Sequence, residues 1–279
     1  MPKLLIVDGH NLLFQMFYGM PSRISGKDGK PVQGVLGFIA ALLKIVRITS
    51  PTHLLVVFDG EICNPCKEMD CNYKANRPDY SMLDDEDNPF TQLDGIYKAL
   101  DFLGVVYTET SDCEADDVIT AYSANFDGEV VISSYDSDFF QLISDRLTVL
   151  RYRGDSSSFC DRDYVKARYG IEPQMYAEHK CLVGDSADNI VGVKGIGPKT
   201  AASLLLRFGS LENLIERCCE IERDKIRNAV IESRDRIFLN RDLIVLRPQA
   251  TIDFTDEKLR IPELPLGGAG SILREIGLL

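Results

Sequence analysis

Three short apolar runs in this chain are each followed by an aspartate. The runs are residues 4–7 before Asp8, residues 54–58 before Asp59, and residues 129–133, which Asp136 follows after two more residues. Short runs rich in Leu, Ile and Val are typical of buried β-strands. Because parallel strands end at one edge of a sheet, these three carboxylates are expected to meet although they lie far apart in the sequence.

Further acids extend this pattern. Glu114, Asp116 and Asp117 open a predicted helix at residues 115–125, with Glu114 and Asp117 on one face and Asp116 pointing in a neighbouring direction. Two closely spaced pairs follow, Asp136 with Asp138 and Asp185 with Asp188. The nine candidate metal ligands are Asp8, Asp59, Glu114, Asp116, Asp117, Asp136, Asp138, Asp185 and Asp188.

Acids gathered this closely repel one another and raise each other's pKa unless cations neutralise them. Carboxylate oxygens without nearby histidine favour Mg²⁺ or Mn²⁺ over zinc. Two such ions about 4 Å apart can activate a water and stabilise the leaving oxygen of a phosphodiester. Taken singly, Asp136 or Glu114 also suits a helix cap and Asp188 a turn, but capping does not explain the whole set.

The remaining pattern predicts an α/β fold with a mostly parallel sheet covered on both faces. Further strands are expected at residues 105–107 and 147–152, and helices at 35–48, 91–103, 115–125 and 139–144. Residues 60–90 form a polar excursion expected to hold one or two helices. We predict a main domain at 1–178, a helical region at 179–246 and a C-terminal segment at 247–279 that packs back on the main domain.

The net charge of −12 does not exclude a nucleic-acid partner. Without the nine candidate ligands, 34 of the 43 acidic residues remain against 31 basic ones, so most of the excess is local. No apolar run is long enough to span a membrane and no signal peptide is evident, which predicts a soluble, cytoplasmic protein, expected to be a monomer. Cys63, Cys66 and Cys71 lie close together, but the histidines lie elsewhere, so free thiols are preferred to a zinc site.

A glycine-rich stretch at residues 192–200 resembles a phosphate-binding loop, but Pro198 interrupts the required Gly-Lys pair. It is better interpreted as a hairpin between two helices. Glycines let the backbone approach a phosphate, and the amides that open the next helix point toward it. Lys194, Lys199 and Arg207 add positive charge nearby, although a simple helix-turn-helix corner remains an alternative. The sequence shows no G-x-S-x-G and no H-E-x-x-H motif.

Within the excursion, Lys74 and Arg77 are predicted to lie one turn apart on a helix that Pro78 ends. Two cations beside the ring of Tyr73 suit a single strand or a scissile phosphate. A solvated helix face is the alternative.

Together these segments resemble the flap endonuclease family and the 5′-nuclease domain of bacterial DNA polymerase I. The matching stretches, in family order between about residues 4 and 205, are Ile6-Val-Asp-Gly9, Val57-Phe-Asp-Gly60, Tyr73-Lys-Ala-Asn-Arg77, Glu114-Ala-Asp-Asp117, Asp136-Ser-Asp138, Gly184-Asp-Ser-Ala-Asp-Asn-Ile190 and Gly192-Val-Lys-Gly-Ile-Gly-Pro-Lys-Thr200. The chain departs from the family pattern around residues 61–71, where three cysteines replace charged and aromatic residues.

The resemblance implies a PIN-like domain, a helical arch at about residues 60–90 and a helix–hairpin–helix module that binds duplex DNA. It assigns Asp8, Asp59, Glu114, Asp116 and Asp136 or Asp138 to a first metal, and Asp185 and Asp188, with some of the same acids, to a second. Lys74 and Arg77 would contact the scissile phosphate and Tyr73 would stack on a base. The hairpin, with a possible K⁺ ion held by its carbonyls, would contribute Gly192, Lys194, Gly195, Gly197, Lys199 and Thr200.

The resulting prediction is a Mg²⁺- or Mn²⁺-dependent phosphodiesterase that uses two or more ions to cut DNA near single-strand/double-strand junctions. It would act as a 5′ flap endonuclease and 5′-3′ exodeoxyribonuclease on flaps, junctions and duplex ends in replication and repair. A PIN-type ribonuclease and a non-catalytic DNA-junction binding protein are the alternatives.

Overall fold

The computed structural model describes residues 1–279 apart from 61–68, 79, 85, 112 and 266. Its main sheet has the strand order β3-β2-β1-β4-β5-β6, and only the pairing of β5 with β6 is antiparallel. The strands are β1 (Lys3–Asp8), β2 (His53–Phe58), β3 (Tyr107–Glu109), β4 (Glu129–Ser133), β5 (Leu147–Arg151) and β6 (Ser158–Cys160). The α/β fold with a mostly parallel sheet is therefore confirmed.

The register of the central strands places their carboxyl ends at one level. Asp8 of β1 lies opposite Val57 of β2, and Val7 lies opposite Ser133 of β4. The loops that follow these strands therefore leave the sheet side by side. This explains how residues more than a hundred positions apart reach a common edge.

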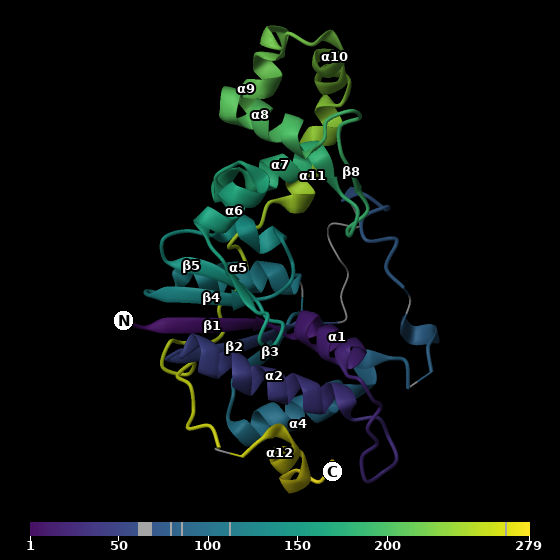
Figure 1. Ribbon diagram of the computed structural model, residues 1–279, viewed down its shortest axis with the longest axis vertical. Coiled ribbons are helices and arrows are strands. Elements are labelled where there is room, and N and C mark those ends of the chain that lie inside the picture. The colour runs from purple at the N-terminus through teal and green to yellow at the C-terminus, as the bar shows by residue number, and fades with distance from the viewer. Residues whose placement is uncertain (61–68, 79, 85, 112, 266) are drawn as a thin grey trace.

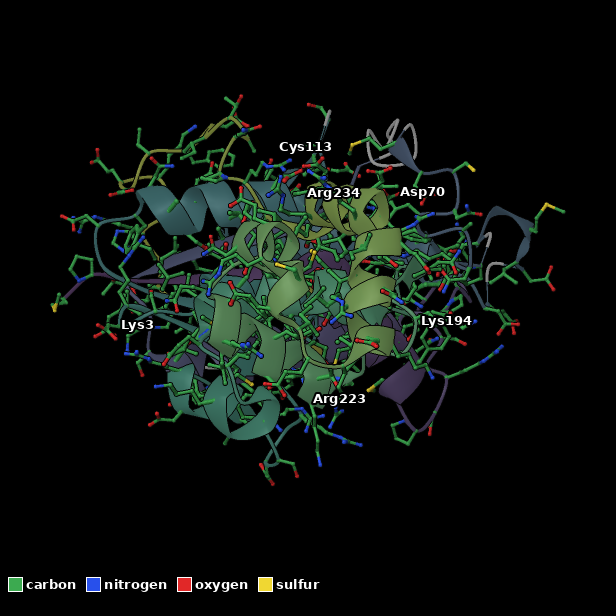
Figure 2. All side chains as sticks on the ribbon, turned by 90° about the horizontal axis from the view of Figure 1, so that it is seen from above. Lys3, Asp70, Cys113, Lys194, Arg223 and Arg234 are labelled. Carbon is green, nitrogen blue, oxygen red and sulfur yellow. The ribbon has the colours of Figure 1, made fainter. Side chains whose placement is uncertain are left out.

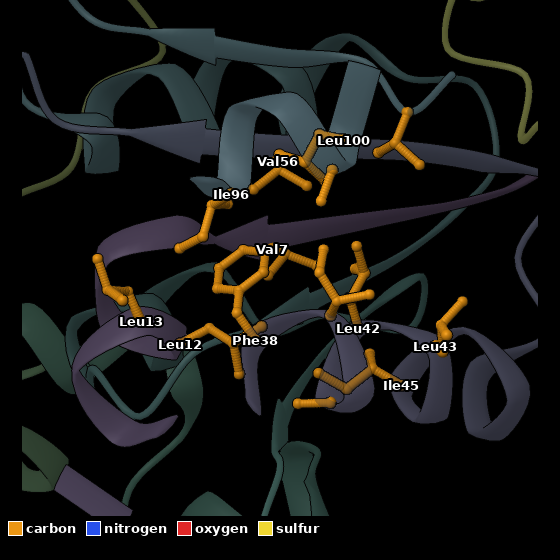
Figure 3. Close-up of a cluster of buried hydrophobic side chains, with 14 of the residues drawn as sticks. Val7, Leu12, Leu13, Phe38, Leu42, Leu43, Ile45, Val56, Ile96 and Leu100 are labelled. Atoms are coloured by element: carbon orange, nitrogen blue, oxygen red, sulfur yellow. The ribbon is translucent and has the colours of Figure 1, made fainter. Parts of the chain in front are cut away.

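Both faces of the sheet are buried by helices (Figure 1). Alternate side chains of a strand point to opposite faces, so Leu5 and Val7 enter one apolar cluster while Leu4 and Ile6 enter another. The first cluster packs against α1 (Gly9–Gly19), α2 (Gln33–Thr49), α4 (Leu93–Leu103) and α12 (Ala269–Glu275), and the second against α5 (Ala115–Asn125) and α6 (Arg162–Tyr169). Figure 3 shows Phe38 of α2 close to Val7 and Val56 in the first cluster.

A helical end stands on one side of the sheet domain and has its own apolar cluster (Figure 1). Its elements are α7 (Tyr176–Val183), β7 (Gly184–Asp185), β8 (Ile190–Val191), α8 (Pro198–Phe208), α9 (Leu211–Glu216), α10 (Asp224–Glu232) and α11 (Arg234–Ile244). The domain boundary predicted at 178/179 falls inside α7. The chain then returns to the sheet, where the N–H of Leu54 donates to the carbonyl of Leu259, and α12 packs on α2.

Sequence patterns located most of these elements. The structure has β4 and α5 at the predicted residues, whereas β3 begins two residues later than predicted and residues 138–142 form a 3-10 helix, η3 (Asp138–Leu142). The elements that were not predicted include α1, α6, α12 and the short strands β6, β7 and β8. Since α1 follows β1 directly, with Asp8 as its N-cap, no turn residues separate the two patterns.

The prediction of a helix that carries Lys74 and Arg77 is wrong. Residues 71–76 form consecutive turns, and Lys74 has a φ of 54°, in the left-handed region that interrupts a helix. Besides Met69, which is helical, the described part of the excursion holds the short 3-10 helices η1 (Tyr80–Met82) and η2 (Pro89–Gln92). Cys63 and Cys66 lie outside the described residues, and Cys71 is an exposed free thiol. No helix in the described ranges is both long and apolar enough to cross a membrane.

Gly192 lies where the hairpin of β7 and β8 crosses the end of α7. A Cβ added to it would stand 2.2 Å from the carbonyl carbon of Val183 and 2.5 Å from the N atom of Gly184, which are backbone atoms with little room to move. At Gly197, by contrast, an added Cβ meets no described atom within 4 Å, and the backbone is extended.

We predict that Gly192→Ala lowers the free energy of unfolding by about 1–3 kcal/mol because the added methyl forces this backbone crossing apart. Gly197→Ala should cost less, at most about 1 kcal/mol, because alanine is a poorer helix N-cap than glycine. Urea unfolding of both variants measures the difference, and equal stabilities would contradict the packing role of Gly192.

Candidate active site

Asp8 is held at the centre of the acidic edge. One carboxylate oxygen accepts a hydrogen bond from the N–H of Asn11 (3.0 Å), and the other accepts one from the Ser134 hydroxyl (2.8 Å). The side chain is buried. Burial raises the pKa of Asp8 to about 6, and the charges of Asp59 and Asp136 add to this effect, which the two hydrogen bonds only partly oppose.

Asp59 and the start of α5 are joined directly. The Asp59 carboxylate accepts a hydrogen bond from the N–H of Ala115 (2.8 Å), the first residue of α5. Although burial acts to raise it, the contact with the His10 ring and the hydrogen bond from the N–H of Ala115 hold the pKa of Asp59 below its usual value. This contact brings Asp116 to the edge, where burial raises its pKa well above the usual value and the nearby Asp136 and Asp8 raise it further.

Glu114 lies beside the base of the excursion. Its carboxylate pairs with the ammonium of Lys74 (2.7 Å) and lies 3.3 Å from the hydroxyl oxygen of Tyr73. Burial acts to lower the pKa of Lys74, but Glu114 and Asp116 outweigh this and raise it, so the lysine stays charged. Burial raises the pKa of Asp117, and Glu114 adds to it, which agrees with the predicted proximity of these two acids.

A second group of acids comes from the other side of the site. Carboxylate oxygens of Asp138, Asp185 and Asp188 all lie within 4.8 Å of one another. Asp138 also connects this trio to the sheet edge, because its N–H donates to the carboxylate of Asp136 (2.8 Å). The N–H of Asp136 in turn donates to the hydroxyl oxygen of Ser134 (3.0 Å). The acids from distant strands and loops therefore form one continuous cluster.

Lys180 was missed by the sequence analysis. This buried lysine of α7 pairs with both Asp138 and Asp185. Burial acts to lower its pKa, but the surrounding carboxylates raise it well above the usual range and keep it charged. Burial raises the pKa of Asp138 to about 7, with Lys180 opposing the shift. A lysine five residues before Asp185, directly before the apolar run of residues 181–183, was the signal that could have identified it.

Arg77 and Tyr73 differ in their access to a ligand. The guanidinium of Arg77 pairs with Asp188 (2.9 Å), and its side chain is 55% exposed. The ring of Tyr73 is only 4% exposed, packs in the apolar cluster of the helical end and carries the Lys74 ammonium 4.8 Å from its centre. Base stacking by Tyr73 does not fit this position, so that expectation is corrected.

The residues of the glycine-rich stretch 192–200 differ in their exposure to solvent. Lys194, Gly195, Gly197 and Lys199 are exposed, and Figure 2, which looks down on the helical end, shows Lys194 near its rim. Gly197 is the N-cap of α8, whose first amides lack partners within the helix. Thr200 is half-buried, and the missing side chain of Gly192 serves packing against α7 instead of ligand approach.

The donor set fits divalent cations. Closely spaced carboxylate oxygens are the ligands that Mg²⁺ and Mn²⁺ prefer. The raised pKa values of Asp8, Asp116 and Asp138 show how strongly the cluster favours neutralisation by bound positive charge. A mostly parallel sheet with this acidic edge, flanked by basic residues of the excursion and of the helical end, suits metal-dependent chemistry on phosphate esters.

The chain belongs to the 5′-3′ exonuclease family. The family model for the 5′-3′ exonuclease N-terminal resolvase-like domain matches residues 3–170, and the model for its C-terminal SAM fold matches residues 171–265. The thermostable DNA polymerase I of Thermus filiformis is 36% identical over 99% of this chain. The match covers only 33% of that polymerase, so the chain spans about a third of its length. A 5′-3′ exonuclease of Aquifex aeolicus is 29% identical, with 99% of this chain and 92% of that protein covered.

Solved structures share the fold. The flap endonuclease of bacteriophage T5, in a complex with DNA and metal ions, aligns with a TM-score of 0.72 at 20% identity and covers 87% of this chain and 88% of that one. The catalytic core of Rad2 in complex with a DNA substrate aligns with a TM-score of 0.61 at 17% identity, over 99% of this chain and 87% of that one.

The raised pKa of Asp8 predicts how pH affects stability when divalent cations are removed. A carboxyl group with a raised pKa contributes stability that is complete below its ordinary value of 3.8 and is lost as the pH rises through about 6. In EDTA above pH 7, Asp8→Asn should therefore be more stable than the wild type by about 1–3 kcal/mol, and the difference should vanish toward pH 4. Urea unfolding at both pH values checks this, and a less stable variant at pH 8 would refute it.

Proposed function

We propose that this chain hydrolyses DNA phosphodiesters near single-strand/double-strand junctions, as a 5′ flap endonuclease and 5′-3′ exodeoxyribonuclease in replication and repair. The observation that carries the proposal is the convergence of the acidic cluster with two cations of the excursion. Lys74 and Arg77 each contact an acid of that cluster. Carboxylates alone would repel a phosphodiester, whereas these cations bring positive charge to the place where a scissile phosphate would lie.

The acids divide into two sets of ligands for two or more Mg²⁺ or Mn²⁺ ions. Bound divalent ions supply activation of a water and stabilisation of the leaving oxygen. The first set is Asp8, Asp59, Glu114, Asp116 and Asp136, with Asp117 beside it. The second set is Asp138, Asp185 and Asp188, whose oxygens already lie close together.

Lys74 and Arg77 neutralise and orient the scissile phosphate. The half-exposed guanidinium of Arg77 can form two parallel hydrogen bonds to phosphate oxygens, and the ammonium of Lys74 acts as a point charge beside Glu114. Lys180, buried between Asp138 and Asp185, keeps the second set of acids together.

The hairpin holds the duplex by its backbone. Exposed Lys194 and Lys199 and the first amides of α8 suit phosphate contacts that carry no sequence information. A K⁺ ion held by the hairpin carbonyls is a prediction that rests on the resemblance.

Replacing one buried acid tests the reaction. Asp116→Asn keeps the shape of the side chain but removes a ligand charge, and should lower the cleavage rate of a 5′-labelled DNA flap at least about 100-fold. Asp163→Asn, which changes an exposed acid in the first turn of α6, should leave the rate within about twofold. Wild-type cleavage in excess EDTA would contradict a metal-dependent reaction.

The same assay separates the alternatives. Parallel DNA and RNA flaps of one sequence distinguish the nuclease proposed here from a PIN-type ribonuclease. Tight binding without product at every Mg²⁺ and Mn²⁺ concentration would favour a junction-binding protein instead.

Lys199→Ala tests the duplex contact. Losing one phosphate contact should weaken binding to duplexes of different sequence alike and reduce the slope of log K against log salt concentration by about 1. Lys44→Ala, on the exposed side of α2, should leave both affinity and slope unchanged. Fluorescence anisotropy measures both quantities. The salt concentration is varied between about 50 and 200 mM, the range over which phosphate contacts lose most of their affinity. A sequence-dependent loss would argue against backbone binding.

A further inference from the structure

A row of hydrogen bonds joins the base of the excursion, residues 72–77, to residues 185–190 of the β7–β8 hairpin, which are called the loop below. We call this row the seam. Its bonds run from the N–H of Lys74 to the carbonyl of Asp188 (2.9 Å), from the side-chain amide of Asn76 to the carbonyl of Ser186 (3.0 Å), and from the side-chain amide of Asn189 to the carbonyl of Asn72 (2.8 Å). In Figure 1 the two segments run side by side next to β8.

Each side of the seam carries part of the proposed machinery. The base of the excursion carries Lys74 and Arg77, and the loop carries Asp185 and Asp188. Arg77 and Asp188 also pair directly across the seam (2.9 Å). The seam therefore fixes the cations that would meet the phosphate relative to the acids of the second ligand set.

Asn189 has a feature that an ordinary turn residue does not need. Its φ of 58° is a conformation that asparagine tolerates better than most residues, which suits a turn. Its amide, however, donates to a carbonyl 117 residues away. Only the nitrogen of the amide can satisfy a carbonyl, so the direction of this bond is defined.

The loop is held in place by α11 independently of the seam. The seam therefore positions the base of the excursion relative to the loop. Asn240 of α11 is completely buried, and its amide donates to the carbonyls of Cys181 (3.0 Å) and Val191 (2.9 Å). These bonds tie β8 to α7. Ile190 packs in the same apolar cluster as Tyr73 of the base.

We infer that Asn189, assisted by Asn76, is a positioning residue that holds Lys74 and Arg77 in register with Asp185 and Asp188. The inference rests on the proposed nuclease function. Displacing a reacting group by about 1 Å can cost on the order of 100-fold in rate, so hydrogen bonds that are individually weak can have a large effect on catalysis.

Asn189→Gly isolates the side-chain donor, because glycine keeps the left-handed backbone. The single-turnover rate on a 5′-labelled DNA flap in Mg²⁺ should fall about 10- to 100-fold. The Kd for the same flap in Ca²⁺ should change by less than about threefold, since Asn189 is not placed on the DNA. Asn189→Asp also tolerates this backbone conformation, but its carboxylate cannot donate a hydrogen bond to the carbonyl of Asn72. Its cleavage rate should fall by a similar factor, and it replaces the glycine variant if that variant fails to fold.

Asn88→Gly is the matched control. Its amide also donates to a backbone carbonyl within the excursion, that of Tyr80 (3.1 Å), but it lies outside the seam. Its cleavage rate should stay within about twofold of the wild type. A loss as large as that of Asn189→Gly would overturn the inference, because the effect would then be a general loosening of the excursion.

Hydrogen exchange in EDTA provides a readout that does not depend on catalysis. The N–H of Lys74 is bonded to Asp188 across the seam, so exchange in residues 72–77 should be at least about 10-fold faster in Asn189→Gly than in the wild type. Unchanged exchange, or faster exchange with an unchanged cleavage rate, would overturn the inference. Absence of cleavage by the wild type would defeat the proposed function, while exchange would still decide whether the seam holds the base.

Discussion

Carboxylates brought together at the edge of a buried sheet repel one another, and burial removes the water that would weaken this repulsion. Burial is the main cause of the raised pKa values of Asp8, Asp116 and Asp138, and the charges of neighbouring acids add to it. Each raised pKa costs the folded chain stability at neutral pH, so the acids stay together only if the surrounding structure holds them. Parallel register and burial on both faces hold the strand ends, while the Ser134 hydroxyl fixes the carboxylate of Asp8 and the N–H of Ala115 fixes that of Asp59.

Positive charge offsets part of this repulsion, and it comes from outside the sheet. Lys74 and Arg77 belong to the excursion and Lys180 to α7. Each pairs with at least one acid of the cluster. The same electrostatics that favour divalent cations therefore help to dock the excursion and the helical end on the sheet. These ion pairs thus hold the segments that cover the site against the acidic edge of the sheet.

What the sequence could predict follows from how local each signal is. The residues of β4 and α5, and the acids that follow the strands, were found because burial periodicity and strand-end acids are local patterns. The left-handed backbone of Lys74 was not found, since its N–H is satisfied by Asp188 in a distant loop. Lys180 was not found for a similar reason. A lysine on a short helix is expected to be exposed to solvent, and only the fold places two acids around it.

The two halves of the cluster are positioned by different means. Strand register sets the first group directly, whereas Asp185 and Asp188 depend on a two-strand hairpin that crosses α7 at Gly192 and is tied to α11. The link between the halves is short. The N–H of Asp138 bonds to Asp136 on the sheet side, and its carboxylate faces the second group. The separation of the two groups of acids is therefore fixed by Asp136 and Asp138, which stand two positions apart in the chain, so acids from such different elements are held in one cluster.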